Sequence, residues 1–421
     1  MKAALARGAY TLLLRLATPV YLARLWWRGA REPAYRQGWA ERLGGTAAAA
    51  PGIGRLWLHA VSLGETRAAA PLIDALRAQQ PGLRLLLTHG TATGREAGLA
   101  LLREGDAQAW LPYDTPGAVR RFLDHHRPAA GVILETEIWP NLLHEARTRQ
   151  LPMTLANARL SERSAAKGRR LATLMGPAVA AFTQVLAQTE ADAARLRAAG
   201  AHEVSVLGNL KFDMTPSPAL LARGHGWRAA ASHSVVLAAV TREGEEAALL
   251  HAWRAHPEPR PQLLIVPRHP QRFDEVAALV QQAGFTLSRR SAWGDDSPQA
   301  AEVWLGDSLS EMPAYYAAAS VALLGGSFAP LGGQNLIEAA ACGCPLLMGP
   351  HTDNFAQAAE QALAAGAALR LAELPAAVAR AVPMALAGGA PLMAARALAF
   401  AAEHRGTAAR MAARILARPA H

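Results

Sequence analysis

Short apolar runs alternate with longer Ala- and Leu-rich stretches from residue 55 onward, and this alternation constrains the fold more than any other feature of the sequence. Apolar runs bounded by turn residues are typical of strands buried on both faces, and helical stretches between them indicate βα units. The runs in the first half are RLWLHAV (55–61), LRLLLTH (83–89), AGVILE (130–135) and PMTLANA (152–158). Those in the second half are SVVLAAV, QLLIVPR, EVWLG and SVALLGG. The pattern therefore predicts an α/β protein built on parallel sheets.

The alternation is interrupted near residue 213 by DMTPSPAL, a polar segment with two prolines. Because 421 residues exceed one ordinary hydrophobic core, we expect two domains, at 31–212 and 219–390, joined by a linker at 213–218. A ligand cleft is expected between them, since parallel sheets bind ligands beside the carboxyl ends of their strands. Residues 391–421 follow, and one long Ala/Arg/Leu helix is expected from about 391 to 417.

The first thirty residues, MKAALARGAYTLLLRLATPVYLARLWWRGA, raise the question of a membrane. Arg15 and Pro19 interrupt their apolar stretch, and an arginine near the centre of a spanning helix costs about 3 kcal/mol. The mixture of cations with Tyr and Trp instead favours a helix at 1–30 that lies in the membrane interface, with its cations on anionic headgroups. A helix packed on the protein core is the alternative interpretation. A cleaved signal peptide fits worse, because the apolar region is interrupted.

Lysine and arginine outnumber aspartate and glutamate by 43 to 33, which gives a formal net charge of +10. This excess suits anionic partners, whether phosphates, nucleic acid or acidic lipid headgroups, and does not choose among them. Cys342 and Cys344 are the two cysteines, and their spacing fits neither a disulfide framework nor a zinc site. We therefore expect a reducing cytoplasm, with both cysteines as small packing residues.

Carboxylates follow two of the expected strands in the first half of the chain. Glu135 and Glu137 stand at the end of the apolar run in VILETEIWPNLL, at the mouth of the expected cleft. Ser62 and Glu65 lie in HAVSLGET, at the junction of the first strand and its helix. Their spacing fits a capping box, in which the glutamate only returns a hydrogen bond to the backbone. It also fits a general base at the carboxyl end of a strand, where Gly64 lets a substrate approach.

A glycine-rich loop links a strand to a helix in SVALLGGSFAPLGGQNLIEAAACGCP. Asn335 is a candidate N-cap and Glu338 its third-position partner, so a capping box again explains the pair. The four glycines exceed the need of one turn, however, and backbone N–H groups at a helix N-terminus favour phosphate. We therefore expect a nucleotide-phosphate site here. The spacing matches neither G-x-G-x-x-G nor a P-loop, which argues against kinase, NTPase and simple dehydrogenase functions.

Basic and polar side chains follow other expected strands. VPRHPQRF supplies Arg268 and His269, which would complement the charge of a nucleotide, although a solvated basic turn is the alternative. GDSLSEM contains Ser308 and Glu311 at capping spacing. Lys211, in LGNLKFD, could reach a leaving phosphate. No Asp-x-Asp triplet occurs in the sequence, so the metal-chelating motif of one large class of sugar-nucleotide transferases is missing.

Taken together, these motifs resemble the 3-deoxy-D-manno-octulosonic acid (Kdo) transferases of Gram-negative lipopolysaccharide assembly. The resemblance extends in order over about residues 20–360 and rests on HAVSLGET, LPYDTP, ETEIWPNLL, NARLSERS, GNLKFD, REGEEA, VPRHPQRF and GGSFAPLGGQNLIEAAACGCPLLMGPHTDNF. It implies a GT-B fold, in which two Rossmann-like domains face a cleft and the last helix crosses back to the N-terminal domain. It also implies inverting transfer of Kdo from CMP-Kdo to the tetraacylated disaccharide bisphosphate precursor of lipid A, without a metal or other cofactor. The N-terminal helix would then lie on the anionic cytoplasmic face of the cell inner membrane.

The family's functional residues carry over to matching positions of this sequence. By the resemblance, Glu65 accepts the proton of the acceptor hydroxyl, and Glu135 and Lys211 stabilise the transition state. An anion at Glu135 would favour the positive charge that develops as the bond between Kdo and CMP breaks. The sequence departs from the family pattern at THGTATG (88–94), where relatives carry Thr-Thr/Met-Thr-x-Thr-Gly. The expected CMP-binding residues are Arg268, His269, Leu309, Ser310, Glu311, Asn335, Leu336, Ile337 and Glu338.

Two other functions remain as alternatives. A GT-B sugar-nucleotide epimerase, or another cell-envelope glycosyltransferase, would share the cleft, and the epimerase would need no membrane contact. A basic nucleic-acid-binding protein is suggested only by the charge of +10. Because the arginines are dispersed along helices without interleaved aromatic platforms, we expect no nucleic-acid partner.

Overall fold

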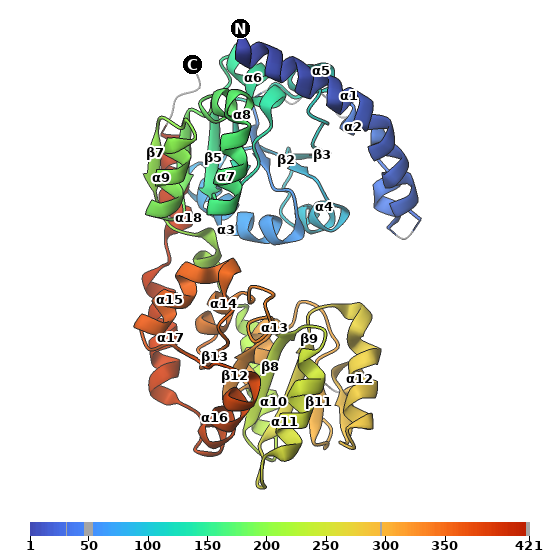
Figure 1. Ribbon diagram of the computed structural model, residues 1–421, viewed down its shortest axis with the longest axis vertical. Helices are drawn as coiled ribbons and strands as arrows, with labels where there is room; N and C mark the ends of the chain where they lie inside the picture. The colour runs from blue at the N-terminus through green and yellow to red at the C-terminus, as the bar shows by residue number, and fades with distance from the viewer. Residues whose placement is uncertain (31, 46–53, 295–296, 418–421) are drawn as a thin grey trace. The chain divides into compact units, whose positions relative to one another are not determined.

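A computed structural model describes the chain from residue 1 to 421, apart from residues 31, 46–53, 295–296 and 418–421 (Figure 1). The chain divides into two compact units. The first comprises Met1–Asp213 together with Gly406–His421, and the second comprises Met214–Arg405. The boundary between Asp213 and Met214 lies in the proline-containing segment that interrupts the strand and helix alternation.

The first unit is built on a seven-stranded parallel sheet with the strand order β3-β2-β1-β4-β5-β6-β7. Its central strand β1 pairs Leu56 with Leu85 on one side and with Ala130 on the other. The strands are β1 (Leu56–His59), β2 (Leu85–His89), β3 (Ala107–Trp110), β4 (Ala130–Leu134), β5 (Met153–Ala158), β6 (Gln184–Ala187) and β7 (Val204–Val206). The helices are α1 (Lys2–Arg28), α2 (Trp39–Arg42), α3 (Leu63–Gln79), α4 (Ala92–Leu99), α5 (Pro116–His126), α6 (Pro140–Thr148), α7 (Glu162–Arg170), α8 (Ala172–Val179), α9 (Glu190–Ala198) and α18 (Thr407–Leu416), with 3-10 turns η1 (Pro33–Arg36) and η2 (Leu210–Asp213).

The second unit repeats this plan with the strand order β10-β11-β9-β8-β12-β13-β14, again all parallel. The strands are β8 (Val235–Thr241), β9 (Gln262–Pro267), β10 (Leu287–Arg289), β11 (Val303–Leu305), β12 (Val321–Leu324), β13 (Leu346–Met348) and β14 (Ala368–Arg370). The helices are α10 (Pro218–Ala230), α11 (Glu245–Ala255), α12 (Phe273–Gln282), α13 (Met312–Ala318), α14 (Leu336–Ala341), α15 (Ala356–Ala364), α16 (Leu374–Leu386) and α17 (Pro391–Glu403), with 3-10 turns η3 (Pro270–Arg272), η4 (Arg290–Ala292) and η6 (Asp353–Phe355).

The predicted parallel-sheet α/β architecture is confirmed, and all eight predicted apolar runs form strands. These strands, such as β1 with every residue buried, lie near the middle of each sheet and are covered on both faces. Six further strands were not predicted from the sequence: β3, β6, β7, β10, β13 and β14. Several of these lie toward the sheet edges and carry polar residues, as in AQAW of β3 and LSR of β10, so their sequences lack a continuous apolar run.

The prediction of one long helix from 391 to 417 is wrong. The chain forms two helices, α17 and α18, separated at residues 404–406, where Gly406 adopts a φ of +86° that ends helical continuity. Asp213 caps the second helix by accepting hydrogen bonds from the backbone N–H groups of Gly406 and Ala408. Helix α18 then packs against α3 and buries Met411 and Ile415 in the core of the first unit.

Helix α1 is attached to the first unit along one side, where it contacts α6 and α8. Tyr10 donates a hydrogen bond to Asp114 at 2.9 Å, and Thr11 exchanges hydrogen bonds with Asn141. No residue of α1 is buried, in contrast to the core-packed alternative. Its opposite side exposes large apolar side chains at Leu5, Leu12, Leu13, Leu16, Val20 and Trp27.

Among the described residues, no single helix is both long and apolar enough to span a membrane. The bent pair Leu374–Leu386 and Pro391–Leu416 is the candidate that these residues contain, by length and composition alone.

Candidate active site

Glu65 lies in the first turn of α3, directly after the carboxyl end of β1. The hydroxyl of Ser62, the N-cap residue, accepts the Glu65 N–H at 3.4 Å. The Glu65 carboxylate in turn accepts the Val61 N–H at 2.8 Å and the Ser62 hydroxyl at 3.3 Å. The capping interpretation of this pair is therefore confirmed. The same contacts hold the carboxylate at the carboxyl edge of the sheet, so a capping role and a catalytic role do not exclude each other.

The environment of Glu65 changes its acidity. Burial, with a smaller contribution from the negative charges of Glu135 and Glu137, raises the pKa of Glu65 to about 7, against the hydrogen bond from the Val61 N–H. Burial also raises the pKa of Glu137, with a contribution from Glu135. Three carboxylates from two βα junctions thus influence one another. A carboxyl group with a pKa near neutrality can both accept and release a proton at physiological pH, which suits a general base.

Glu135 follows β4 in a backbone conformation with φ +60°, which residues other than glycine rarely adopt. Its N–H donates to the Ala156 carbonyl at 3.0 Å, and its carbonyl accepts the Arg159 N–H at 3.3 Å. Both bonds join it to β5 and the segment after it, which holds the conformation in place. Strained backbone of this kind is concentrated at functional sites, where neighbouring contacts impose it. Lys211 lies opposite, with its Nζ atom 3.8 Å from Glu135 Oε1.

Three amide side chains, which the sequence analysis did not single out, position the backbone of the Lys211 segment. The fully buried Asn157 accepts the Leu210 N–H at 3.1 Å. Asn209 accepts the Lys211 N–H at 3.0 Å and donates to Gln188 at 3.0 Å. The signal available in the sequence was the presence of asparagine in NARLSERS and GNLKFD, two of the motifs that carry the family resemblance.

The loop at 88–94 packs directly behind the Glu65 turn. His89 Nδ1 lies 3.0 Å from the Ala60 carbonyl and 3.3 Å from the Thr66 hydroxyl. A Cβ atom on Gly94 would lie 3.1 Å from the backbone of Ser62, so a side chain there would press on the N-cap residue. The loop therefore supports the turn that holds Glu65, although its sequence departs from the family pattern.

In the second unit, the glycine-rich loop follows β12 and leads into α14. Asn335 is the N-cap of α14 and accepts the Ile337 N–H at 3.2 Å, as expected. Gly326, with φ +69°, donates its N–H to both carboxylate oxygens of Glu245 at 2.8 Å. Gly333 donates its N–H to the Gly326 carbonyl at 2.8 Å. The Gly325 N–H donates to the Ala239 carbonyl at 2.8 Å, so three glycine N–H groups of the loop bind the protein itself, contrary to the expectation that they are exposed to a phosphate.

Leu336, Ile337 and Glu338 form the first turn of α14. Leu336 and Ile337 are each 1% exposed, so their side chains are buried and do not face a ligand.

Arg268 and His269 follow β9 and are exposed. Slight burial together with the charges of Arg242, Arg268 and Arg272 lowers the pKa of His269. Arg272 is bound to the buried Glu246 at 2.8 Å. The positive charges around His269 attract an anion, and they lie at the carboxyl end of the sheet.

Glu311 lies after β11 in a cluster of arginines. The expectation that Ser308 caps the next helix is wrong, because α13 begins at Met312 with Glu311 as its N-cap residue. Ser308 instead donates its hydroxyl to the Glu311 carboxylate, which also receives two hydrogen bonds from Arg290 at 3.0 Å and one from Arg223 at 2.7 Å. Burial alone would raise the pKa of Glu311, but the bonds from Ser308 and Arg290 lower it. The carboxylate therefore stays ionised.

The expected CMP-binding residues share one edge of the second sheet. Arg268 and His269 follow β9, Leu309 and Ser310 follow β11, and Asn335 follows β12. Ser310 has a φ of +64°, and its neighbour Leu309 is 69% exposed, so the Leu309 side chain is open to solvent at this turn. Within the described parts of the chain, no group of three or more His, Cys, Asp or Glu residues is arranged to hold a metal ion.

Comparison with solved structures identifies the fold. The crystal structure of HepE from Anabaena in complex with UDP is 15% identical, has a TM-score of 0.56 and matches 87% of this chain and 100% of its own. The UDP-GlcNAc 2-epimerase from Neisseria meningitidis is 16% identical, has a TM-score of 0.55 and matches 87% of this chain and 98% of its own. Together with the two parallel-sheet units, these matches confirm the predicted GT-B fold. At such identities they carry no information on activity.

Comparison of sequences separates the functional alternatives. The family model described as 3-deoxy-D-manno-octulosonic-acid transferase matches residues 37–214. A Kdo transferase from Bordetella pertussis is 49% identical over 369 residues, which cover 85% of this chain and 86% of its own. The Kdo transferase from Haemophilus influenzae is 34% identical and covers 83% and 84% of the two chains. The chain therefore belongs to the family of 3-deoxy-D-manno-octulosonic acid transferases, glycosyltransferases of lipopolysaccharide biosynthesis.

Proposed function

We propose that the chain transfers Kdo from CMP-Kdo to the tetraacylated disaccharide bisphosphate precursor of lipid A, with inversion at the transferred carbon and without a metal. The observation that carries the proposal is Glu65, a half-buried carboxyl group with a pKa of about 7 at the carboxyl end of β1. A base with this pKa is ionised in a large fraction of molecules near neutral pH, and it becomes a stronger proton acceptor than an exposed glutamate.

In the proposed reaction, Glu65 takes the proton from the acceptor hydroxyl as its oxygen attacks the anomeric carbon of Kdo. The bond between that carbon and the phosphate oxygen of CMP breaks, and CMP leaves with the electron pair. One displacement from the opposite face inverts the configuration. Holding the two substrates in line can itself remove several kcal/mol from the barrier.

Glu135 and Lys211 are proposed to stabilise the transition state. Their contact at 3.8 Å leaves both groups only partly desolvated, with 21% and 24% of their side chains exposed. The carboxylate of Glu135 would favour positive charge on the sugar, and the ammonium of Lys211 would favour negative charge on the departing phosphate. The cations around Arg268 and His269 are proposed to bind the cytidylate. Their side chains would then stabilise the negative charge of the leaving CMP.

We further propose that α1 lies on the cytoplasmic face of the inner membrane, where the lipid acceptor resides. The support is the row of exposed apolar side chains on the side of α1 that faces away from the unit, flanked by the exposed cations Arg15 and Arg24. An apolar stripe combined with basic residues is typical of helices that lie in the interface of anionic membranes.

The decisive experiment is mass spectrometry of the lipid after incubation with CMP-Kdo and the precursor. A mass increase by one or more Kdo residues, with release of CMP, is expected. An unchanged lipid, with wild-type protein that is folded and binds CMP, would contradict the proposal. The same assay counts the transferred sugars and, repeated with a chelator, shows whether a metal is needed.

A further inference from the structure

A pocket of about 260 Å³ lies between the start of α1 and the helices α6 and α8. Figure 1 shows α1 lying across α6 and α8 at this end of the first unit. Arg7 of α1 and His144 and Arg147 of α6 supply its polar lining, and Leu174 and Pro177 of α8 belong to its apolar lining. Within the described chain, the lining contains no acidic side chain. The pocket is thus positively charged and partly apolar.

The positive charge of this pocket is not neutralised inside the protein. Neither Arg7 nor Arg147 forms an ion pair with any residue of the described ranges. Glu145, next to His144 in the chain, is bound to Arg149 at 2.6 Å. Arg7 acts at longer range on Asp114, which is buried and already accepts hydrogen bonds from Tyr10, Asn141 and Leu142.

The titration of His144 reflects the same charges. Burial, Arg7 and Arg147 lower the pKa of His144, against the effect of Glu145. An imidazole whose protonation is opposed by two arginines would gain a proton more easily once an anion enters the pocket.

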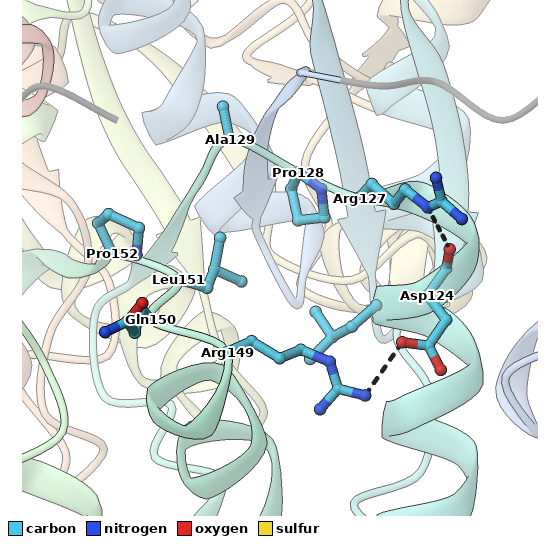
Figure 2. A pocket seen from close by; sticks show the side chains of 9 residues that line it. Asp124, Arg127, Pro128, Ala129, Arg149, Gln150, Leu151 and Pro152 are labelled. Carbon is cyan, nitrogen blue, oxygen red and sulfur yellow. Dashed lines mark hydrogen bonds and ion pairs between the residues drawn. The ribbon is translucent and has the colours of Figure 1, made fainter. Parts of the chain in front are cut away.

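A second pocket of the first unit shows the contrasting arrangement. It lies at the amino ends of β4 and β5 and contains Arg127 and Arg149 (Figure 2). There Arg149 is bound to Asp124 at 3.0 Å, and Arg127 Nε donates to the Asp124 carbonyl at 3.1 Å, as Figure 2 shows. Arg149 is therefore neutralised by acids, whereas the arginines of the pocket beside α1 are available to an external anion.

The position of α1 suggests which anion enters. A helix that lies in a membrane interface is buried by about 5–10 Å, close to its own diameter of about 10 Å, so its far side stands at the level of the headgroups. Arg7 is on that side, facing the unit, while Leu5 and Leu12 point away from it and are 68% and 60% exposed. A ligand with a phosphate and adjoining apolar chains matches both the basic pocket at Arg7 and the exposed apolar side of α1.

We propose that the pocket formed by Arg7, His144 and Arg147 binds the phosphate headgroup of an anionic membrane lipid and so orients the protein on the bilayer. This inference rests on the proposed membrane attachment of α1. It adds a defined headgroup site to the diffuse attraction that any basic surface exerts on an anionic bilayer.

The test compares two double variants of the full chain in binding to vesicles of phosphatidylcholine and phosphatidylglycerol. R7Q/R147Q removes two charges from the pocket, and the matched control R15Q/R24Q removes two exposed charges from α1. Each charge contributes a roughly five-fold change in diffuse attraction. We expect R7Q/R147Q to lose roughly ten-fold more affinity than R15Q/R24Q, because a phosphate held by two arginines is desolvated. Equal losses would overturn the defined site, and so would a wild-type chain that does not bind the vesicles.

A second measurement distinguishes a lipid from free phosphate. The pKa of His144, followed by NMR in the wild-type chain, should rise on adding phosphatidylglycerol vesicles and should not rise in R7Q/R147Q. A rise with inorganic phosphate but not with vesicles would contradict the lipid assignment. Transfer to detergent-dispersed acceptor is measured in parallel. Its absence in the wild-type chain refutes the proposed catalysis, while the vesicle-binding and NMR measurements decide the headgroup site.

Discussion

The Nζ atom of Lys211 lies 3.8 Å from Oε1 of Glu135, and this pair joins two segments that are far apart in the sequence. Glu135 ends β4, whereas Lys211 belongs to η2 at the end of the first unit's main segment. Glu135 also raises the pKa of Glu65 through its negative charge. The charge of Glu135 therefore links the proposed transition-state pair electrostatically to Glu65, the proposed base.

Replacing Lys211 with Gln should shift the acidic limb of the pH–rate profile toward higher pH. Without the nearby cation, Glu135 would oppose ionisation of Glu65 more strongly, so a higher pH would be needed to form the base. E135Q should shift the same limb in the opposite direction, because it removes one of the negative charges that raise the pKa of Glu65. Profiles of kcat/KM for both variants test this. Shifts of the same sign would contradict the assigned coupling.

Replacing Glu65 with Gln should reduce turnover by about 10²- to 10⁴-fold, the usual contribution of a positioned general base. CMP affinity, measured by calorimetry, should be unchanged. Because Glu65 also belongs to the cap of α3, S62A serves as the control. It should lower the free energy of unfolding by about 1 kcal/mol, as loss of an N-cap does, while most of the turnover remains. If E65Q and S62A lost turnover equally, the effect would be structural.

Ionisation of Glu65 should affect both the rate and the stability of the wild-type protein as pH changes. The rate should rise with pH and level off above about pH 7, where the carboxyl group is ionised. Stability should change in the opposite direction, since the pKa of Glu65 rises from 4.5 to about 7 on folding. Between these values the folded chain holds more protons than the unfolded chain, so the free energy of unfolding falls as pH rises. The difference between wild type and E65Q in urea unfolding, measured across this range, isolates the effect.

Two arginines near β9 should respond differently to replacement with Gln. R268Q should raise KM for CMP-Kdo roughly 10- to 100-fold, the value of a hydrogen bond to a charged group, with little loss of stability because the side chain is exposed. R272Q should lower the free energy of unfolding by about 3–5 kcal/mol, because it leaves Glu246 buried without its partner at 2.8 Å. Steady-state kinetics and urea unfolding separate the two effects. An unchanged KM in R268Q would remove Arg268 from the donor site.

Part of the site could be read from the sequence because its signals are local. Ser62 and Asn335 stand immediately before helical stretches, and each caps its helix in the structure. Glu65 and Glu135 follow apolar runs, so their place at the carboxyl ends of strands was predictable. Ser308 followed the same local rule and was wrong, because its hydroxyl binds the Glu311 side chain and the helix begins later. Spacing alone does not show which hydrogen bond a side chain forms when several partners are available.

Other features depend on contacts between distant segments. Asn157 and Gln188 support the Lys211 segment through hydrogen bonds to Leu210 and Asn209, which are 53 and 21 positions away, and no periodicity encodes these contacts. The break at residues 404–406 is stabilised by Asp213, nearly two hundred positions earlier. A glycine inside a helical composition is compatible with a continuous helix, so the sequence around Gly406 does not by itself predict the break.

The order of βα units, the position of the central strands and the helix caps were determined by the sequence itself, because hydrophobic periodicity and capping preferences act over a few residues. Only the tertiary structure decided that three carboxylates share one environment and that Glu65 acquires a pKa of about 7. Burial and charge interaction depend on distances through space, and these are set when the strands pair and the helices pack on both faces of the sheet.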